Sequence, residues 1–186
     1  MGQDKGLLPF HGKPLIAHIA DRGRTLTDDL LVTTNQIEAY QFLHLPLYPD
    51  RLPQRGSLVG MHTALSASNR PLVAVVGCDM PFFSPQLLAF QAHLLEKGDA
   101  EAVVPHGPDG LEPLHGVYKR ETCLAAVRQA LERNIFSLVG WLGFLHCLEV
   151  PERQIELNDP KGRAFINLNT PEEYQWAESL LLSDGQ

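Results

Sequence analysis

The residues best suited to chemistry follow an apolar segment near the middle of the chain. Residues 71–77 (PLVAVVG) are apolar throughout and predict a strand buried on both faces, with Cys78-Asp79-Met80-Pro81 at its carboxyl end. An aspartate in this place can hold Mg²⁺, which takes one or two protein carboxylates and fills its other positions with water and phosphate oxygens. It can equally cap the following turn. Position alone leaves both interpretations of Asp79 open.

Two further segments carry groups that suit a ligand. Asp50 ends a weaker predicted strand at 45–48, where an aspartate by itself is more often a turn residue than a ligand. Gly56 and Gly60 lie in GSLVGM (residues 56–61), at the start of a predicted helix. Glycine lets a ligand approach the backbone closely, and the first N–H groups of a helix favour anions. As a motif, this spacing of two glycines is weak.

Strands and helices alternate along the chain, and this order predicts how those residues are positioned. The predicted strands are 30–32, 45–48, 71–77, 102–104, 114–118 and 144–150. The predicted helices are 14–25, 37–43, 56–68, 84–96, 121–132 and 174–182, the last preceded by a capping box at 170–173. Alternation of this kind indicates one three-layer α/β domain with a mostly parallel sheet, in which ligands bind at the carboxyl ends of the strands. Residues 33–35, 50 and 78–81 should therefore share one edge.

The composition is typical of a single globular domain and argues against several other classes of protein. Hydrophobic residues make up 44% of 186, enough for a core in a single domain. The net charge is −7 and no Lys/Arg run exceeds a pair, which argues against a nucleic-acid surface. No 18-residue apolar run and no signal-peptide pattern occur. Cys78, Cys123 and Cys147 are odd in number and widely spaced, which fits a reduced cytoplasm, and the eight histidines show no structural-metal spacing.

The first residues carry a glycine-rich, charged pattern that resembles a known loop. MGQDKGLL (residues 1–8), followed by GKPL (residues 12–15), is similar to the end of the signature Leu-Ala-Gly-Gly-x-Ser-x-Arg-Met-Gly-x-Asp-Lys of the nucleotidyltransferases. Further matches come in order at 56–61 (GSLVGM), 78–81 (CDMP), 112–118 (EPLHGVY) and 165–173 (FINLNTPEE). Together they resemble the MobA family, the molybdenum cofactor guanylyltransferases, over essentially the whole chain. This resemblance implies a Rossmann-like α/β/α nucleotidyltransferase domain over residues 1–186.

The resemblance also implies roles for individual residues. The family's triphosphate-binding lysine falls on Lys5, and its magnesium aspartate falls on Asp79, which favours the metal interpretation of that residue. Both are expected to be catalytic. Its base- or ribose-contacting carboxylate falls on Asp50. The family often has an asparagine at the position of Thr33, and in this chain the asparagine, Asn35, comes two residues later. The nucleobase contacts expected of Thr33 and Asn35 therefore depart from the family's pattern.

The remaining positions complete two expected subsites. Gly60 joins the GTP-binding set, and Asn167 and Asn169 match positions expected near the pterin, although loop-capping amides are the alternative for both. His115 lies within an apolar predicted strand, where it either lines the pterin side or packs in the sheet.

The reaction implied is transfer of GMP from GTP to molybdopterin with Mg²⁺, releasing pyrophosphate. Related alternatives use CTP or a sugar phosphate, and a different class of answer is a catalytically impaired homologue that binds nucleotide or cofactor. By the resemblance, the family's first strand and its Leu-Ala-Gly-Gly half-loop would precede Met1, and we expect weak GTP binding without them. Molybdoenzymes or their chaperones are the expected recipients of the product, with no nucleic acid or membrane as partner.

Overall fold

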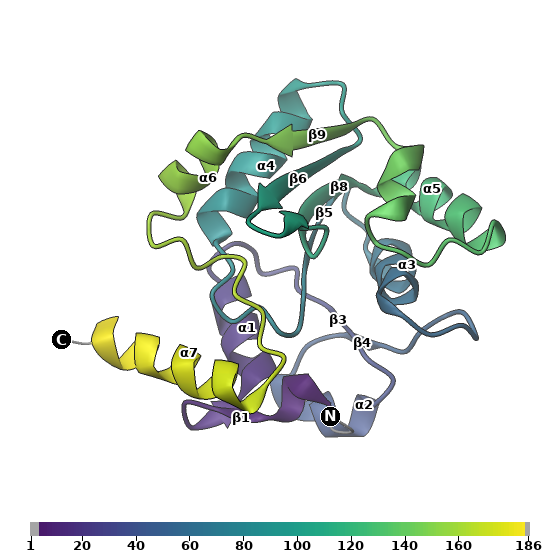
Figure 1. Cartoon of the computed structure of the whole chain (residues 1–186). Coiled ribbons are helices and arrows are strands. Elements are labelled where there is room, and N and C mark those ends of the chain that lie inside the picture. The colour runs from purple at the N-terminus through teal and green to yellow at the C-terminus, as the bar shows by residue number, and fades with distance from the viewer. Residues whose placement is uncertain (1–3, 185–186) are drawn as a thin grey trace.

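A computed structural model of the protein describes residues 4–184, so the first three residues of the expected phosphate loop lie outside it (Figure 1). The main sheet has the order β5 (Leu72–Val76), β8 (His115–Lys119), β6 (Ala102–Gly107) and β7 (Gly110–Leu111), and β9 (Cys147–Val150) pairs with β6. Strands β5 and β6 are each antiparallel to β8, and β9 is parallel to β6. Three long strands therefore share one direction and β8 opposes them.

The reversed direction of β8 follows from the length of its connection to β6. Only residues 108–114 separate the two strands, and a parallel crossover needs a dozen or more residues. The short strand β7 folds back on β6 in a tight hairpin, with Gly110 at φ 122°. The expected mostly parallel α/β architecture is thus confirmed, with one antiparallel strand inside the sheet.

Helices cover both faces of this sheet. Figure 1 shows α4 (Pro85–Lys97) and α6 (Glu152–Asn158) on one side, and α3 (Ser57–Ala67) and α5 (Arg120–Glu132) on the other. The buried residues divide accordingly into two clusters. Val103 packs with the cluster that contains α1 (Leu15–Gly23) and α4, whereas its neighbours Ala102 and Val104 pack with the cluster of α3 and α5. Successive side chains of a strand point to opposite faces, so this alternation shows that β6 is buried on both faces. The sheet with helices on each side forms a three-layer sandwich.

Two small pairings lie outside the main sheet. Strands β3 (Val32–Thr33) and β4 (Leu47–Tyr48) are parallel, so Thr33 and Tyr48 end them at the same edge. Strands β1 (Pro9–Phe10) and β2 (Lys13–Pro14) form an antiparallel hairpin. Its two turn residues, His11 and Gly12, have φ values of 44° and 84°, as the tightest hairpin turns require.

Several boundaries differ from those expected. The predicted helix 37–43 divides into α2 (Ile37–Tyr40) and a 3-10 turn, Gln41–Leu43, which ends at left-handed His44. The predicted strand 144–150 begins only at Cys147, because Gly140–Phe144 forms a 3-10 turn that buries Trp141 and Leu142. The helix α6 was not predicted. Within the part of the chain that the structure describes, no helix is long and apolar enough to cross a membrane, and all three cysteines are free thiols.

Candidate functional site

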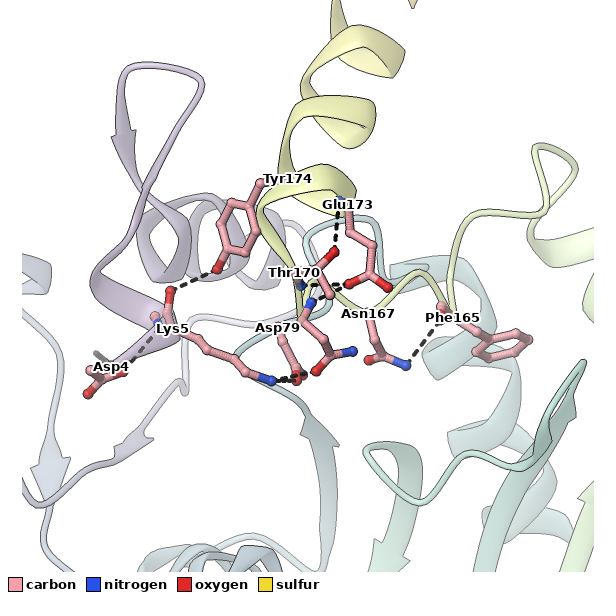
Figure 2. A network of polar contacts seen from close by, with 10 residues as sticks. Asp4, Lys5, Asp79, Phe165, Asn167, Thr170, Glu173 and Tyr174 are labelled. Atoms are coloured by element: carbon pink, nitrogen blue, oxygen red, sulfur yellow. Dashed lines mark hydrogen bonds and ion pairs between the residues drawn. The ribbon is translucent and has the colours of Figure 1, made fainter. Parts of the chain in front are cut away.

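Three side chains from distant parts of the sequence meet at the carboxyl end of β5. The Lys5 ammonium lies 3.3 Å from Oδ2 of Asp79 and donates a hydrogen bond of 2.5 Å to Oδ1 of Asn169 (Figure 2). These partners are 74 and 164 residues away from Lys5 in the sequence. A lysine, a carboxylate and an amide expected to contact the substrates therefore form one group.

Backbone bonds fix Asp79 at this edge. Its carbonyl accepts a hydrogen bond of 2.9 Å from the N–H of Leu168, which ties the end of β5 to the loop that carries Asn169. The N–H of Gly77 continues the pairing with β8 by donating to Leu114. A Cβ at Gly77 would lie 2.8 Å from Oδ1 of Asp79, so glycine leaves room for the carboxylate. The Asp79 side chain is 21% exposed, so it remains accessible to a metal ion while it pairs with Lys5.

Two tyrosines and an aspartate hold the turn that carries Lys5. Oδ1 of Asp4 accepts from the N–H of Gly6 at 3.1 Å and from the hydroxyl of Tyr40 at 2.8 Å. The hydroxyl of Tyr174 donates to the carbonyl of Lys5 at 3.1 Å, a contact visible in Figure 2. Burial raises the pKa of both tyrosines, that of Tyr174 to about 12, so both remain protonated donors near neutral pH. The Lys5 backbone is thus fixed from two sides.

The close fit at Gly6 gives a testable stability effect. A Cβ at Gly6 would lie 2.5 Å from the hydroxyl oxygen of Tyr40, so Gly6→Ala should cost ~1–3 kcal/mol of unfolding free energy through overpacking. Tyr40→Phe removes that oxygen. In urea denaturation we therefore expect the double variant to have a larger free energy of unfolding than the sum of the two single changes predicts. A Cβ at Gly143 would meet nothing within 4 Å, so the control Gly143→Ala should keep nearly the wild-type free energy of unfolding. Strict additivity would contradict the clash.

The amino terminus of α7 (Pro171–Asp184) positions Asn169. The Thr170 hydroxyl accepts from the N–H of Glu173 at 3.2 Å, and the Glu173 carboxylate accepts from the N–H groups of Asn169 at 2.6 Å and of Thr170 at 2.9 Å. These reciprocal bonds confirm the predicted capping box. The two backbone hydrogen bonds lower the pKa of Glu173, so the cap is charged at neutral pH.

Asn167 lies in the same loop but bonds locally. Its Nδ2 donates to the carbonyl of Phe165 at 3.2 Å, as Figure 2 shows. Asn167 therefore makes the loop-stabilising contact that was the alternative expected for both asparagines. The Asn169 amide instead bonds to Lys5. A contact of either with a pterin stays a prediction.

The other residues expected to bind the nucleotide form a second group at the ends of β3 and β4. Asn35 donates to Oδ2 of Asp50 at 2.8 Å and accepts from its N–H at 2.9 Å, so the two side chains fix each other. A Cβ at Gly60 would lie 3.6 Å from the Thr33 hydroxyl, which shows how closely α3 approaches β3. Gln36 links this group to the Lys5 turn by donating to Asp4 at 3.0 Å.

His115 is placed in the core rather than at the surface. Its ring is fully buried, lies edge-on to Phe83 and Phe165, and accepts a hydrogen bond of 3.0 Å on Nε2 from the N–H of Ser84. The sequence left two positions open for His115, lining the pterin side or packing in the sheet, and the structure shows it packed in the sheet. Burial lowers the pKa of His115 to about 4, so the ring is neutral at physiological pH.

This buried ring should make stability depend on pH. The unfolded chain takes up the His115 proton near pH 6.5, but the folded protein does so only near pH 4. The free energy of unfolding should therefore fall as the pH drops through this window, by up to roughly 3 kcal/mol. His115→Gln keeps an acceptor for Ser84 and cannot titrate, so chemical denaturation should show a flatter profile. The exposed control His93→Gln should keep the wild-type slope, and equal slopes in all three proteins would refute this assignment.

Sequence reasoning missed the residues that support Lys5. Asp4 carried a usable pattern, because an aspartate two residues before a glycine commonly accepts from that N–H. No local pattern identifies Tyr40 or Tyr174, whose contacts with the Lys5 turn span 36 and 169 residues. Glu112 was also missed as a carboxylate near the site. Burial raises its pKa, with the charges of Asp109 and Asp79 adding to the effect.

The donor set fits a magnesium ion that arrives with phosphates. Among residues 4–184, no three His, Cys, Asp or Glu side chains gather closely enough to hold a metal by themselves. A lone, partly exposed carboxylate such as Asp79 suits Mg²⁺, because that ion keeps several waters and takes its other ligands from substrate phosphates.

Comparisons with known proteins show the family of the chain. Residues 1–143 match the MobA-like NTP transferase domain. The probable molybdenum cofactor guanylyltransferase of Carboxydothermus hydrogenoformans is 30% identical over 94% of this chain and 87% of that protein. The molybdenum cofactor guanylyltransferase of Cupriavidus taiwanensis is 31% identical over 96% of this chain and 89% of its own length.

A solved structure supports the fold independently. Molybdopterin-guanine dinucleotide biosynthesis protein A from Archaeoglobus fulgidus superposes with a TM-score of 0.85, covering 98% of this chain and 92% of that one at 23% identity. At that identity the likeness concerns the fold alone. The match over residues 1–143, together with the relatives at 30% and 31% identity, places this chain, a nucleotidyltransferase, in the MobA-like NTP transferase family.

Proposed function

We propose that the protein transfers GMP from GTP to molybdopterin, forming molybdopterin guanine dinucleotide and pyrophosphate. The observation that carries this proposal is the meeting of Lys5, Asp79 and Asn169 at the carboxyl end of β5. Relatives about 30% identical over most of the chain, named molybdenum cofactor guanylyltransferases, support the choice of substrates.

The chemistry needs alignment and neutralisation of charge rather than a base. The attacking group is the terminal phosphate of molybdopterin, which is already anionic near neutral pH, and the α-phosphorus of GTP is the electrophile. Lys5 places a point charge on the triphosphate. Asp79 would hold Mg²⁺, which when bound would supply further neutralisation of the phosphate charge. The buried, neutral His115 is unsuited to the part of a general base.

The two groups of residues suggest how the substrates are oriented. We assign the nucleoside of GTP to the Thr33, Asn35, Asp50 and Gly60 group, and the pterin to the side of the loop that carries Asn167 and Asn169. Lys5 lies between Asp79 and Asn169, so its ammonium is within reach of the phosphates of both substrates in this arrangement.

Nucleotide preference tests the proposal directly. We expect pyrophosphate release in the presence of molybdopterin and Mg²⁺ to be at least ~10-fold faster with GTP than with CTP or ATP, because hydrogen-bonding groups discriminate strongly between bases. Faster release with CTP would move the protein to the cytidylyl branch. Absence of release with every nucleotide, despite measurable GTP binding, would support a non-catalytic homologue.

The setting of the enzyme is part of the same proposal. We place it in the cytoplasm, where its three free thiols would remain reduced. Residues 1–186 are assigned to one nucleotidyltransferase domain, supported by a single main sheet with a core on each face. The product would pass to molybdoenzymes or their chaperones.

A further inference from the structure

The first turns of α7 contact the segment that carries Lys5 at three points. The Tyr174 hydroxyl donates to the Lys5 carbonyl at 3.1 Å, and the Glu178 carboxylate accepts from the N–H of His11 at 2.7 Å. Tyr174 and Glu178 are one helical turn apart, so both side chains lie on the same face of α7. The third contact is the bond from the Lys5 ammonium to Asn169, just before the helix. The start of α7 therefore holds this segment through its backbone as well as through the Lys5 side chain.

The ring of Tyr174 is anchored separately from its hydroxyl. The side chain is buried in the same apolar cluster as Phe10, and the two rings meet edge-on with their centroids 6.2 Å apart. At the far end of the ring, the hydroxyl points to the backbone of the Lys5 turn, as Figure 2 shows. Tyr174→Phe should therefore remove one polar contact and keep the packing of the ring.

The Lys5 carbonyl has a second donor, so it does not depend on Tyr174 for a partner. The N–H of Leu8 also donates to this oxygen, at 3.1 Å, within the turn itself. The carboxylate of Asp4 holds the other side of the turn through the N–H of Gly6. Loss of the hydroxyl leaves no backbone group of the turn without a partner, which is the costly case. What the hydroxyl adds is the position of the turn relative to α7.

The position of this turn decides where the Lys5 ammonium lies. A lysine carries its point charge on a flexible stem, so the side chain alone does not fix it. Asn169 precedes α7 and Asp79 follows β5, and the ammonium meets both only when the turn is held at one place between them. Displacement of a catalytic group by about 1 Å can cost on the order of 10²-fold in rate.

We propose that Tyr174 is a positioning residue, whose hydroxyl sets the place of the Lys5 ammonium by tying the Lys5 turn to α7. The inference rests on the proposed function, in which Lys5 binds the triphosphate. Because the loop assigned to the pterin leads directly into α7, the same tie holds the segment assigned to the phosphates of GTP and the loop assigned to the acceptor as one unit.

A double-mutant cycle of Tyr174→Phe with Lys5→Met tests this role. Alone, Tyr174→Phe should lower kcat for pyrophosphate release from Mg²⁺–GTP with molybdopterin by roughly 10-fold and change KM for GTP by less than ~2-fold. In the Lys5→Met background the same change should lower kcat by less than ~2-fold, because the group that the hydroxyl positions is gone. A merely structural role would lower kcat equally in both backgrounds.

Chemical labelling of Lys5 gives a second readout, which needs no substrate. Acetic anhydride should acetylate Lys5 at least ~2-fold faster in Tyr174→Phe than in the wild type, because the loosened ammonium leaves its two partners more often. Mass spectrometry of peptides measures this rate. Lys97, an exposed residue at the end of α4, is the internal reference and should react equally fast in both proteins.

Ser179→Ala is the matched control for loss of a hydroxyl from α7. The Ser179 hydroxyl donates to the carbonyl of Trp176 within the helix, so this variant should keep the wild-type kcat and Lys5 labelling rate. Equal losses of kcat through Tyr174→Phe in the two backgrounds, or an unchanged Lys5 labelling rate, would overturn the proposal. If the wild type released no pyrophosphate with any nucleotide, the proposed function would fail, and the labelling rate would still decide whether Tyr174 positions Lys5.

Discussion

Replacement of Asp79 by alanine should lower the rate of pyrophosphate release from GTP by at least ~10²-fold, as removal of a preorganised electrostatic contact does. Asp79→Asn should lose nearly as much, because the amide keeps the shape of the side chain but not its negative charge. Steady-state turnover at saturating Mg²⁺ measures both. The carboxylate is the charged group at the end of β5 that faces Lys5, so we expect no neighbour to replace it.

The structure predicts that this loss is chemical rather than a consequence of unfolding. The Lys5–Asp79 pair is partly exposed, with side chains 33% and 21% accessible, and such pairs contribute only about 0–1 kcal/mol. Circular dichroism and the urea midpoint should therefore change little in Asp79→Ala. Asp99→Asn, which alters a carboxylate with a 94% exposed side chain, serves as the control and should keep full turnover. Near-normal GTP turnover by Asp79→Ala would refute the site.

The second large effect is expected at Lys5. Lys5→Met keeps the length and apolar stem of the side chain but removes the charge, and should lower kcat/KM for Mg²⁺–GTP by ~10²-fold, in line with the loss of one charged contact at a reacting phosphate. Lys5→Arg should recover only part of this, because the ammonium contacts both Asp79 and Asn169 as a point charge, and a planar guanidinium fork does not reproduce that arrangement.

A neighbouring lysine provides the control for this variant. Lys13 forms an exposed ion pair with Asp21 on α1, away from the Asp79 group, so Lys13→Met should change kcat/KM by less than ~2-fold. If Lys13→Met and Lys5→Met reduced kcat/KM equally, the effect would lie in overall charge rather than in the contact with Asp79 and Asn169.

The sequence predicted those parts of the fold that local patterns encode. The apolar run before Asp79 identified β5, and Ser84-Pro85 identified the start of α4, where the Ser84 side chain accepts from the N–H of Leu87. The capping box at Thr170 was predicted for the same reason, since its partners are three residues apart. Such patterns depend on hydrogen bonds and periodicities within a few residues, which a single sequence displays.

The contacts that complete the site are not local, and the sequence could not reveal them. Tyr174 follows the capping box and looks like a core aromatic, yet its hydroxyl holds the carbonyl of Lys5. From its sequence, His115 either lines the pterin side or packs in the sheet, and only the positions of Phe83 and Phe165 around it favour packing. The reversed β8 could have been anticipated from its short connection, because chain length restricts the direction of a strand.

The tie between Lys5 and the start of α7 has a consequence for biosynthesis. Lys5 leaves the ribosome well before Asn169 and Tyr174, which hold its side chain and its carbonyl and follow 164 and 169 residues later. At the usual pace of translation this delay is roughly 10–30 s. During that time the nascent chain can form β5, β6 and β8 but not the complete Lys5 group. Interrupted synthesis would therefore release chains with much of the sheet and no finished catalytic centre.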